Sequence, residues 1–137
     1  MTHAAITLST ETTHNPGAPR HFMRLKPAGR RVRILRQGEV LAETDDALRL
    51  VEVGKDVYDP TLYLPEADIR AGLRQTDKAT HCPLKGDAVY FDLLDADGNV
   101  VCPEIAWAYP APFDFADALA GRIAFYSAQV TVEESPL

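Results

Sequence analysis

A β-hairpin pattern spans residues 88–109 and sets the framework for the rest of the chain. Residues 88–94 (AVYFDLL) are rich in side chains that favour extended backbone, and residues 95–99 (DADGN) are typical of a tight turn. The chain then returns through residues 100–109 (VVCPEIAWAY) as the partner strand. This is the strongest strand prediction in the sequence.

The centre of the turn decides which residues of the hairpin face each other. With Asp97 and Gly98 at the two central positions, Gly86 lies opposite Tyr109. The same turn pairs Ala88 with Trp107, Tyr90 with Ile105 and Leu93 with Cys102. A turn centred on Gly98 and Asn99 would slip the register by one residue and exchange the faces of the strands. The pattern therefore predicts that the open ends of the two strands converge, and it leaves the face open.

Two segments with polar and aromatic side chains meet at this open end. The first, Thr80–Gly86 (THCPLKG), places a thiol and a cation just before the first strand. The second, Trp107–Pro112 (WAYPAP), ends the second strand, and its prolines force an extended exit. We predict a small-molecule pocket between them, with catalytic residues undetermined. The ligand-binding candidates are Glu52, Tyr63, Cys82, Lys85, Trp107 and Tyr109, and Glu104 is a further polar candidate.

Each candidate also has a simpler interpretation. Cys82 beside His81 could be a nucleophile with a neighbouring base, but adjacent residues of an extended chain point to opposite sides, which favours a buried, unreactive thiol. Lys85 could hold an anionic group or be a solvated loop lysine. Trp107 and Tyr109 share a strand face, and they either pack in the core or form a stacking wall for a ring or a sugar.

Residue spacing gives no prediction of a metal or cofactor site. The chain has only two cysteines, Cys82 and Cys102, twenty residues apart, which cannot make a four-thiolate zinc site, and the four histidines show no metal-ligand spacing. The segment Asp95–Asn99 lacks the glycine that a calcium loop needs and is interpreted as a turn. The H-E-x-x-H, G-x-S-x-G and G-x-G-x-x-G motifs are absent. We therefore expect no metal and no cofactor.

The remaining segments predict short strands and little helix. We expect about seven strands in all, which gives an all-β class, a small barrel or folded sheet. The further strands are predicted at residues 22–26, 31–36, 40–44, 48–53 and 122–132.

Helix is predicted in only two places. Residues 65–74 begin with a proline, continue with acids and end with arginines, a pattern that favours a short helix. Residues 114–119 follow with a single helical turn.

The composition fits one soluble globular domain. Of the 137 residues, 46% are hydrophobic and 25% charged, so we assign residues 21–137 to one domain and residues 1–20 to an N-terminal tail. No apolar run approaches the ~18 residues of a membrane span, and the start of the chain lacks the features of a signal peptide. We expect a cytoplasmic protein with two free thiols and no membrane partner.

The charge distribution is uneven. The net charge of -6 argues against nucleic-acid binding, which requires Lys and Arg to neutralise phosphates. The segment Arg20–Arg36 nevertheless holds seven of the 14 cations and no acid. It either pairs with the acidic remainder of the chain or forms an anion-binding contact surface.

Four motifs in order resemble the bacterial domain-of-unknown-function 427 family over residues 31–132. They are Tyr63-x-Pro65-x-x-Asp68, Thr80-x-Cys82-Pro83-x-Lys85-Gly86-x-Ala88-x-Tyr90, Ala106-Trp107-x-Tyr109-Pro110-x-Pro112 and Gly121-Arg122-Ile123-Ala124-Phe125-Tyr126. The resemblance implies a compact all-β domain of the β-tent, or Mss4-like, type, which some classifications label nucleotidyltransferase-like. It places the six ligand-binding candidates on or beside family motifs. The cysteine pairs that bind zinc in β-tent relatives are absent.

Two functions follow as hypotheses. The first is a cytosolic domain that binds a small anionic, aromatic or nucleotide-like ligand between the two segments, with catalysis left open. The second is a non-catalytic interaction module that uses the segment Arg20–Arg36. A homo-oligomer is compatible with either function.

Overall fold

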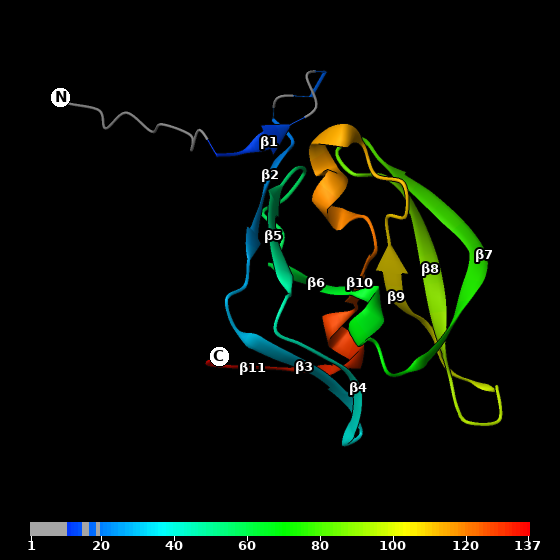
Figure 1. Cartoon of the computed structure of the whole chain (residues 1–137). Coiled ribbons are helices and arrows are strands. Elements are labelled where there is room, and N and C mark those ends of the chain that lie inside the picture. The colour runs from blue at the N-terminus through cyan, green and yellow to red at the C-terminus, as the bar shows by residue number, and fades with distance from the viewer. Residues whose placement is uncertain (1–10, 15–16, 19) are drawn as a thin grey trace.

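The computed structural model describes residues 11–14, 17–18 and 20–137, and its architecture is all-β (Figure 1). The large sheet contains, in spatial order, β1 (Thr13–His14), β2 (Phe22–Pro27), β5 (Leu48–Val53), β6 (Thr61–Pro65), β10 (Arg122–Phe125), β9 (Val100–Ala108), β8 (Gly86–Leu94) and β7 (Gly72–Cys82). The small sheet contains β11 (Thr131–Ser135), β3 (Arg31–Arg36) and β4 (Glu39–Thr44). Three short 3-10 helices complete the description: η1 (Glu66–Asp68), η2 (Asp114–Leu119) and η3 (Ser127–Gln129).

All strand pairs in the two sheets are antiparallel, and the large sheet is bent without closing into a barrel. In Figure 1, β2 and β5 form one wing, β7, β8 and β9 form the other, and β6 and β10 join them. The small sheet lies beneath this junction. The predicted all-β class is confirmed, and the sheet takes its folded rather than its barrel form.

The two faces of the large sheet belong to two separate clusters of buried side chains. Leu64, Ala106 and Ile123 point into the cluster shared with the small sheet, where they meet Val32 and Ile34. The alternate residues of the same strands point into the second cluster, between the two wings; examples are Tyr63, Trp107 and Ala124. Strand alternation thus places the aromatic residues of the predicted site on the concave face.

The predicted 88–109 hairpin forms, with a change of register along its length. Near the turn, Leu93 pairs with Cys102 as predicted. The predicted turn centre is wrong by one residue: the Gly98 N–H donates to the Asp95 carbonyl at 3.1 Å, so Ala96 and Asp97 are the central residues. Further out, Tyr90 pairs with Trp107 rather than Ile105, because a bulge inserts two extra residues into β9. At this bulge Glu104 adopts a φ of 49° and its N–H donates to Asp92 Oδ1 at 2.8 Å.

This two-residue shift also answers the question of the face. The period of a strand is two, so a shift of two residues changes the partners but leaves the faces of the two strands matched beyond the bulge. Ile105, next to the bulge, is the exception and packs in the other cluster. Tyr90 and Trp107 therefore share the concave face. The predicted pairing of Gly86 with Tyr109 is wrong. The predicted convergence of the two segments is confirmed, because a Cβ added at Gly86 would lie 3.4 Å from both the Ala111 carbonyl oxygen and the Pro112 Cα.

The helix predicted over residues 65–74 is wrong. Pro65 and the acids after it start only the single 3-10 turn of η1, and an eleven-residue strand, β7, begins at Gly72. This strand pairs with β8 along most of its length. The physical reason is that backbone pairing with a strong neighbouring strand outweighs the local preferences that favour a helix.

Because β7 extends to Cys82, the Thr80–Gly86 segment has a different structure from the one predicted. Cys82 pairs with Gly86, so residues 83–85 are the loop of a tight β7–β8 hairpin rather than an entry from a loop. The loop folds inward, since Leu84 and Lys85 are 0% and 5% exposed.

The described residues form eleven strands, more than the predicted seven. Three of them, β1, β6 and β7, were not predicted. The predicted last strand is in fact two strands, β10 and β11, which belong to different sheets.

The end of the predicted tail is part of the sheet. Strand β1 pairs with Met23 and Phe22 of β2, while residues 1–10 lie outside the described part of the chain. The predicted turn at residues 114–119 is confirmed as η2. Among the described residues, no helix has the length and apolar character needed to cross a membrane.

Gly86 allows the hairpin loop and the segment after β9 to approach closely, which yields a first prediction. Its φ is +111°, and an added Cβ would lie 3.4 Å from both the Ala111 carbonyl oxygen and the Pro112 Cα. Gly86→Ala should therefore lower stability by on the order of 1–3 kcal/mol, which corresponds to several degrees in melting temperature. Gly72→Ala is the control, because a Cβ there meets only ordinary contacts beyond 3.6 Å. Equal melting temperatures for the two variants in calorimetry would contradict this role of Gly86.

Candidate functional site

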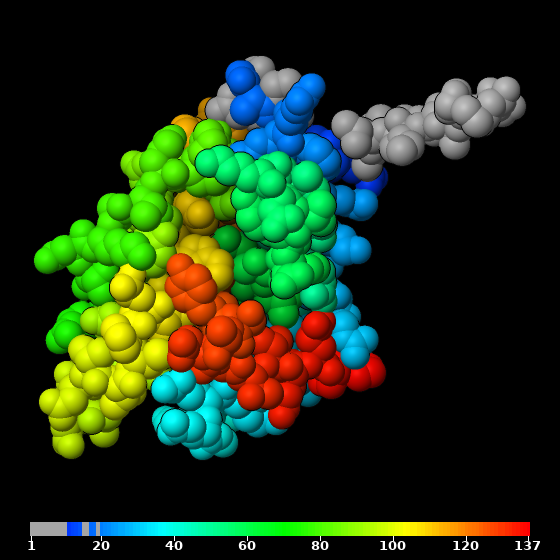
Figure 2. All heavy atoms as spheres, turned by 180° about the vertical axis from the view of Figure 1, so that it is seen from behind, coloured from blue at the N-terminus to red at the C-terminus, as the bar shows by residue number. Residues whose placement is uncertain are grey.

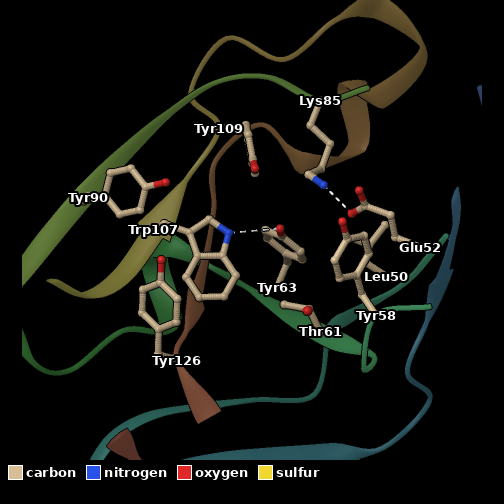
Figure 3. Close-up of a pocket in the computed structure, with 10 residues that line it drawn as sticks. All are labelled: Leu50, Glu52, Tyr58, Thr61, Tyr63, Lys85, Tyr90, Trp107, Tyr109 and Tyr126. Atoms are coloured by element: carbon tan, nitrogen blue, oxygen red, sulfur yellow. Dashed lines mark hydrogen bonds and ion pairs between the residues drawn. The ribbon is translucent and has the colours of Figure 1, made fainter. Parts of the chain in front are cut away.

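A cavity of about 280 Å³ opens on the concave face between the two wings (Figures 2 and 3). In Figure 2 the surface is hollowed between the blue-green segment that follows β5 and the green to yellow strands β7 to β9. Most of its lining is aromatic. The lining residues are Leu50, Glu52, Tyr58, Thr61, Tyr63, Lys85, Tyr90, Trp107, Tyr109 and Tyr126.

An ion pair between Lys85 and Glu52 lies at one end of the cavity. Lys85 Nζ donates to Glu52 Oε1, and the two side chains are only 7% and 12% exposed. Glu52 shares a face of β5 with the buried Leu48 and Leu50, so strand alternation turns its carboxylate inward. The pair joins the β7–β8 loop to β5, that is, one wing of the sheet to the other (Figure 3).

The other oxygen of this carboxylate has a partner of its own. His21 Nε2 lies 2.6 Å from Glu52 Oε2. His21 directly precedes β2, and its ring packs on Gly54, where an added Cβ would lie 3.1 Å from the imidazole. Glu52 is therefore held between a lysine on one side and a histidine on the other.

Lys85 keeps hydrogen-bonding capacity for a ligand. Within the described part of the chain its ammonium has one acceptor, Glu52, which leaves two of its three N–H groups available. The ammonium also lies 5.5 Å from the centre of the Tyr109 ring. The interpretation of Lys85 as a solvated loop lysine is therefore wrong, because the inward fold of the hairpin loop buries it.

The wall opposite the ion pair is built on Trp107. Its indole N–H donates to the Tyr63 hydroxyl at 3.1 Å, and the two rings meet edge to face with centres 6.3 Å apart. Tyr126 packs on the other side of the indole, with ring centres 4.4 Å apart. Figure 3 shows Tyr63 between Trp107 and Tyr58, with the hydroxyl of Tyr109 pointing into the cavity.

The two most enclosed tyrosines remain neutral phenols. Burial raises the pKa of Tyr63 well above its ordinary value of 10, and burial likewise raises the pKa of Tyr109. Both can therefore donate a hydrogen bond, and neither is a base at neutral pH. The Tyr63 hydroxyl already accepts from Trp107, so its own proton is free to donate elsewhere.

Cys82 lies outside this cavity, in a neighbouring one of about 700 Å³. The two cavities share Glu52 and Tyr58 in their linings. The thiol is half-buried and free, and Cys102 is also free, as the sequence predicted. The neighbour of Cys82 is His21 rather than His81: the ligand atoms of His21, Glu52 and Cys82 all lie within 4.8 Å of one another.

The structure thus brings five of the six ligand-binding candidates into one cavity and places the sixth beside it. The side chain of Glu104 binds Lys78 on the exposed surface and does not line the cavity. The sequence reasoning missed His21, Tyr58, Thr61, Tyr90 and Tyr126. Tyr126 ends a family motif and could have been found, whereas Tyr58 belongs to a segment without a periodic pattern.

The arginines of the Arg20–Arg36 segment largely pair with acids of the same chain. Arg24 contacts Glu11, Arg30 contacts Glu134, Arg31 contacts Asp45 and Arg33 contacts Glu43 and Glu133. Arg36 donates instead to the Gln129 carbonyl at 2.9 Å. The interpretation that this segment pairs with the acidic remainder of the chain is confirmed for Arg24, Arg30, Arg31 and Arg33.

The acidic turn at residues 95–99 is a structural feature. Asp95 Oδ1 accepts from the backbone N–H groups of Asp97 and Asn99 at 2.9 and 2.8 Å, and these bonds lower the pKa of Asp95. This agrees with its interpretation as a hairpin turn.

Comparison with protein families matches residues 24–135 to the model described as Domain of unknown function (DUF427). The chain belongs to this family. The match confirms the resemblance seen in the four motifs, and it includes every residue that lines the smaller cavity. His21 precedes the part of the chain that the DUF427 model covers. A search of curated proteins found no match.

A second prediction concerns the buried pair of this DUF427 domain. Lys85→Met and Glu52→Gln should each destabilise the protein by about 3 kcal/mol, because each removes one partner of a buried ion pair. The double variant should cost less than the sum by at least about 1 kcal/mol, measured by urea unfolding.

The control cycle uses an exposed pair. Arg31 Nε lies 2.8 Å from Asp45 Oδ1, and both side chains are about half exposed. Arg31→Met and Asp45→Asn should show a much smaller coupling energy, because exposed ion pairs contribute little to stability. A coupling between Lys85 and Glu52 no larger than this control would mean that the buried pair contributes nothing special to the fold.

Proposed function

We propose that this protein binds a small planar ligand with a carbonyl or carboxylate group in the cavity between Trp107 and the Lys85–Glu52 pair. The observation that carries the proposal is the combination of an aromatic wall with a buried ion pair that retains free N–H groups. Aromatic residues around a few fixed polar groups are typical of small-molecule sites.

The polar groups specify the edge of the ligand. The two free N–H groups of Lys85 would donate to an oxygen of the ligand, and the Glu52 carboxylate beside them would accept from a neighbouring N–H or O–H. The Tyr109 hydroxyl, which has no hydrogen-bond partner among the described residues, adds a group that can donate or accept. An amide-like edge, as in a nucleobase or an aromatic carboxamide, matches this arrangement.

The size and the charge of the cavity limit the class of ligand further. A cavity of about 280 Å³ lies just below the ~300–1,000 Å³ of typical ligand sites, which favours one ring system over a whole nucleotide. Glu52 also compensates the charge of Lys85, so the site favours a neutral ligand or a monoanion over a polyphosphate. Nucleotidyl transfer would require carboxylates that hold a metal at the phosphates, and of the described residues that line the smaller cavity only Glu52 is an acid.

The third prediction tests this proposal with defined probes. Adenine, uracil, nicotinamide and benzoate are screened for an increase in melting temperature, and the dissociation constant of the best probe is measured by calorimetry. Tyr109→Phe should leave stability nearly unchanged and weaken binding about fivefold, the equivalent of one hydrogen bond of about 1 kcal/mol. The Lys85→Met/Glu52→Gln double variant should remain folded and lose binding.

Lys26→Met serves as the matched lysine control, because Lys26 is exposed on β2. This variant should bind the probe as tightly as the parent. The proposal fails if none of the four probes stabilises the parent protein, or if the folded double variant binds the best probe as tightly as the parent does.

A further inference from the structure

A cluster of three metal-binding side chains lies on the far side of Glu52 from Lys85. His21, Glu52 and Cys82 offer an imidazole nitrogen, a carboxylate oxygen and a sulfur atom, all within 4.8 Å of one another. They come from the residue before β2, from β5 and from the end of β7. We propose that these residues bind one divalent transition-metal ion, with zinc as the best match.

The geometry is close to what a zinc ion requires. Tetrahedral zinc with bonds of about 2.0–2.3 Å keeps its ligand atoms about 3.3–3.6 Å apart. His21 Nε2 and Glu52 Oε2 now lie 2.6 Å apart and would separate slightly as the metal replaces the proton between them. Shifts on the order of 1 Å would bring the Cys82 sulfur into range.

The chemistry of the donor set favours zinc over harder cations. Thiolate and imidazole ligands select zinc and similar ions, whereas calcium and magnesium prefer oxygen ligands alone. On binding a metal, the Cys82 thiolate and the Glu52 carboxylate would supply two negative charges to a divalent ion, and Glu52 would share its charge with the Lys85 ammonium. None of the three side chains is exposed, so they are held near one another before the metal arrives.

Lys85 supports this site from the second coordination layer. It holds Oε1 of Glu52, which directs Oε2 toward His21 and Cys82. Such outer partners orient metal ligands and commonly change metal affinity 10–100-fold when removed.

The fourth coordination position faces a cavity that can admit a ligand. His21, Glu52 and Cys82 all line the 700 Å³ cavity, together with Tyr58 and His81. Three protein ligands with one open position are the pattern of catalytic rather than structural zinc sites. Metal bound here would therefore leave room for a water molecule or a substrate, next to the cavity that Trp107 walls.

The fourth prediction tests metal binding with cobalt as a spectroscopic probe. The reduced full-length chain, freed of metal by a chelator, is titrated with Co²⁺ alone. We expect one equivalent to bind, with the near-ultraviolet charge-transfer band of a cobalt–thiolate bond and the visible bands of a tetrahedral site. Zn²⁺ should then displace the cobalt.

Variants assign the ligands. Cys82→Ser should abolish the charge-transfer band, and His21→Gln should weaken Co²⁺ binding by at least about tenfold. Cys102→Ser and His14→Gln are the matched controls, because Cys102 is buried in the other cluster and His14 is exposed on β1. Both controls should bind Co²⁺ like the parent.

A second measurement needs no variant and covers the case in which Cys82→Ser does not fold. Zn²⁺ should slow the alkylation of Cys82 by iodoacetamide in the parent protein, followed by peptide mass spectrometry. The proposal is overturned if the parent binds no cobalt stoichiometrically, if the band survives in Cys82→Ser, or if His21→Gln binds as the parent does. Tyr109→Phe should leave cobalt binding intact, so this test stands apart from that of the planar ligand.

Discussion

The buried ion pair between Lys85 and Glu52 joins the two wings of the sheet, and the surrounding structure is arranged around it. Removing an unpaired charge from water costs several kcal/mol, so neither residue can be buried unless the other is in place. Lys85 is held in the loop of the β7–β8 hairpin, and Glu52 is held on β5. The distance between the wings is therefore fixed by an electrostatic contact as well as by packing.

The aromatic residues complete this arrangement by lining the rest of the cavity. Trp107 is fixed through its hydrogen bond to Tyr63 and its contact with Tyr126. Burial raises the pKa of Tyr63 and Tyr109, so these groups stay neutral and add no further charge to the site. The cavity thus has one charged end, which is internally compensated, and one aromatic end. This polarity is the physical basis for the planar ligand that we propose.

Glu52 connects two distinct chemical environments. Its Oε1 accepts from Lys85 beside the aromatic cavity, and its Oε2 lies against His21 in the larger cavity that also contains Cys82. A change on one side, such as metal binding at Oε2, would alter the charge that Lys85 experiences on the other. The two proposed sites are adjacent because they share Glu52. Substitutions at different side chains test them separately.

The sequence by itself determined the all-β class, the hairpin over residues 88–109 and the convergence of the Lys85 and Trp107 segments. These features follow from local patterns: strand alternation, turn chemistry and the short range of a hairpin. Five of the six ligand-binding candidates line one cavity. They could be predicted because they belong to those patterns or to family motifs.

Tertiary structure alone decided the rest. The bulge at Glu104 set which residues pair in the hairpin, and pairing with β8 turned residues 72–74 from a predicted helix into strand β7. The inward fold of the hairpin loop buried Lys85. The contact of His21 with Glu52 joins residues 31 positions apart, and no spacing rule reaches so far. In each case the local conformational preference of a segment competes with contacts to residues that are distant in sequence. Those contacts form only when the sheet assembles, so a local pattern cannot predict them.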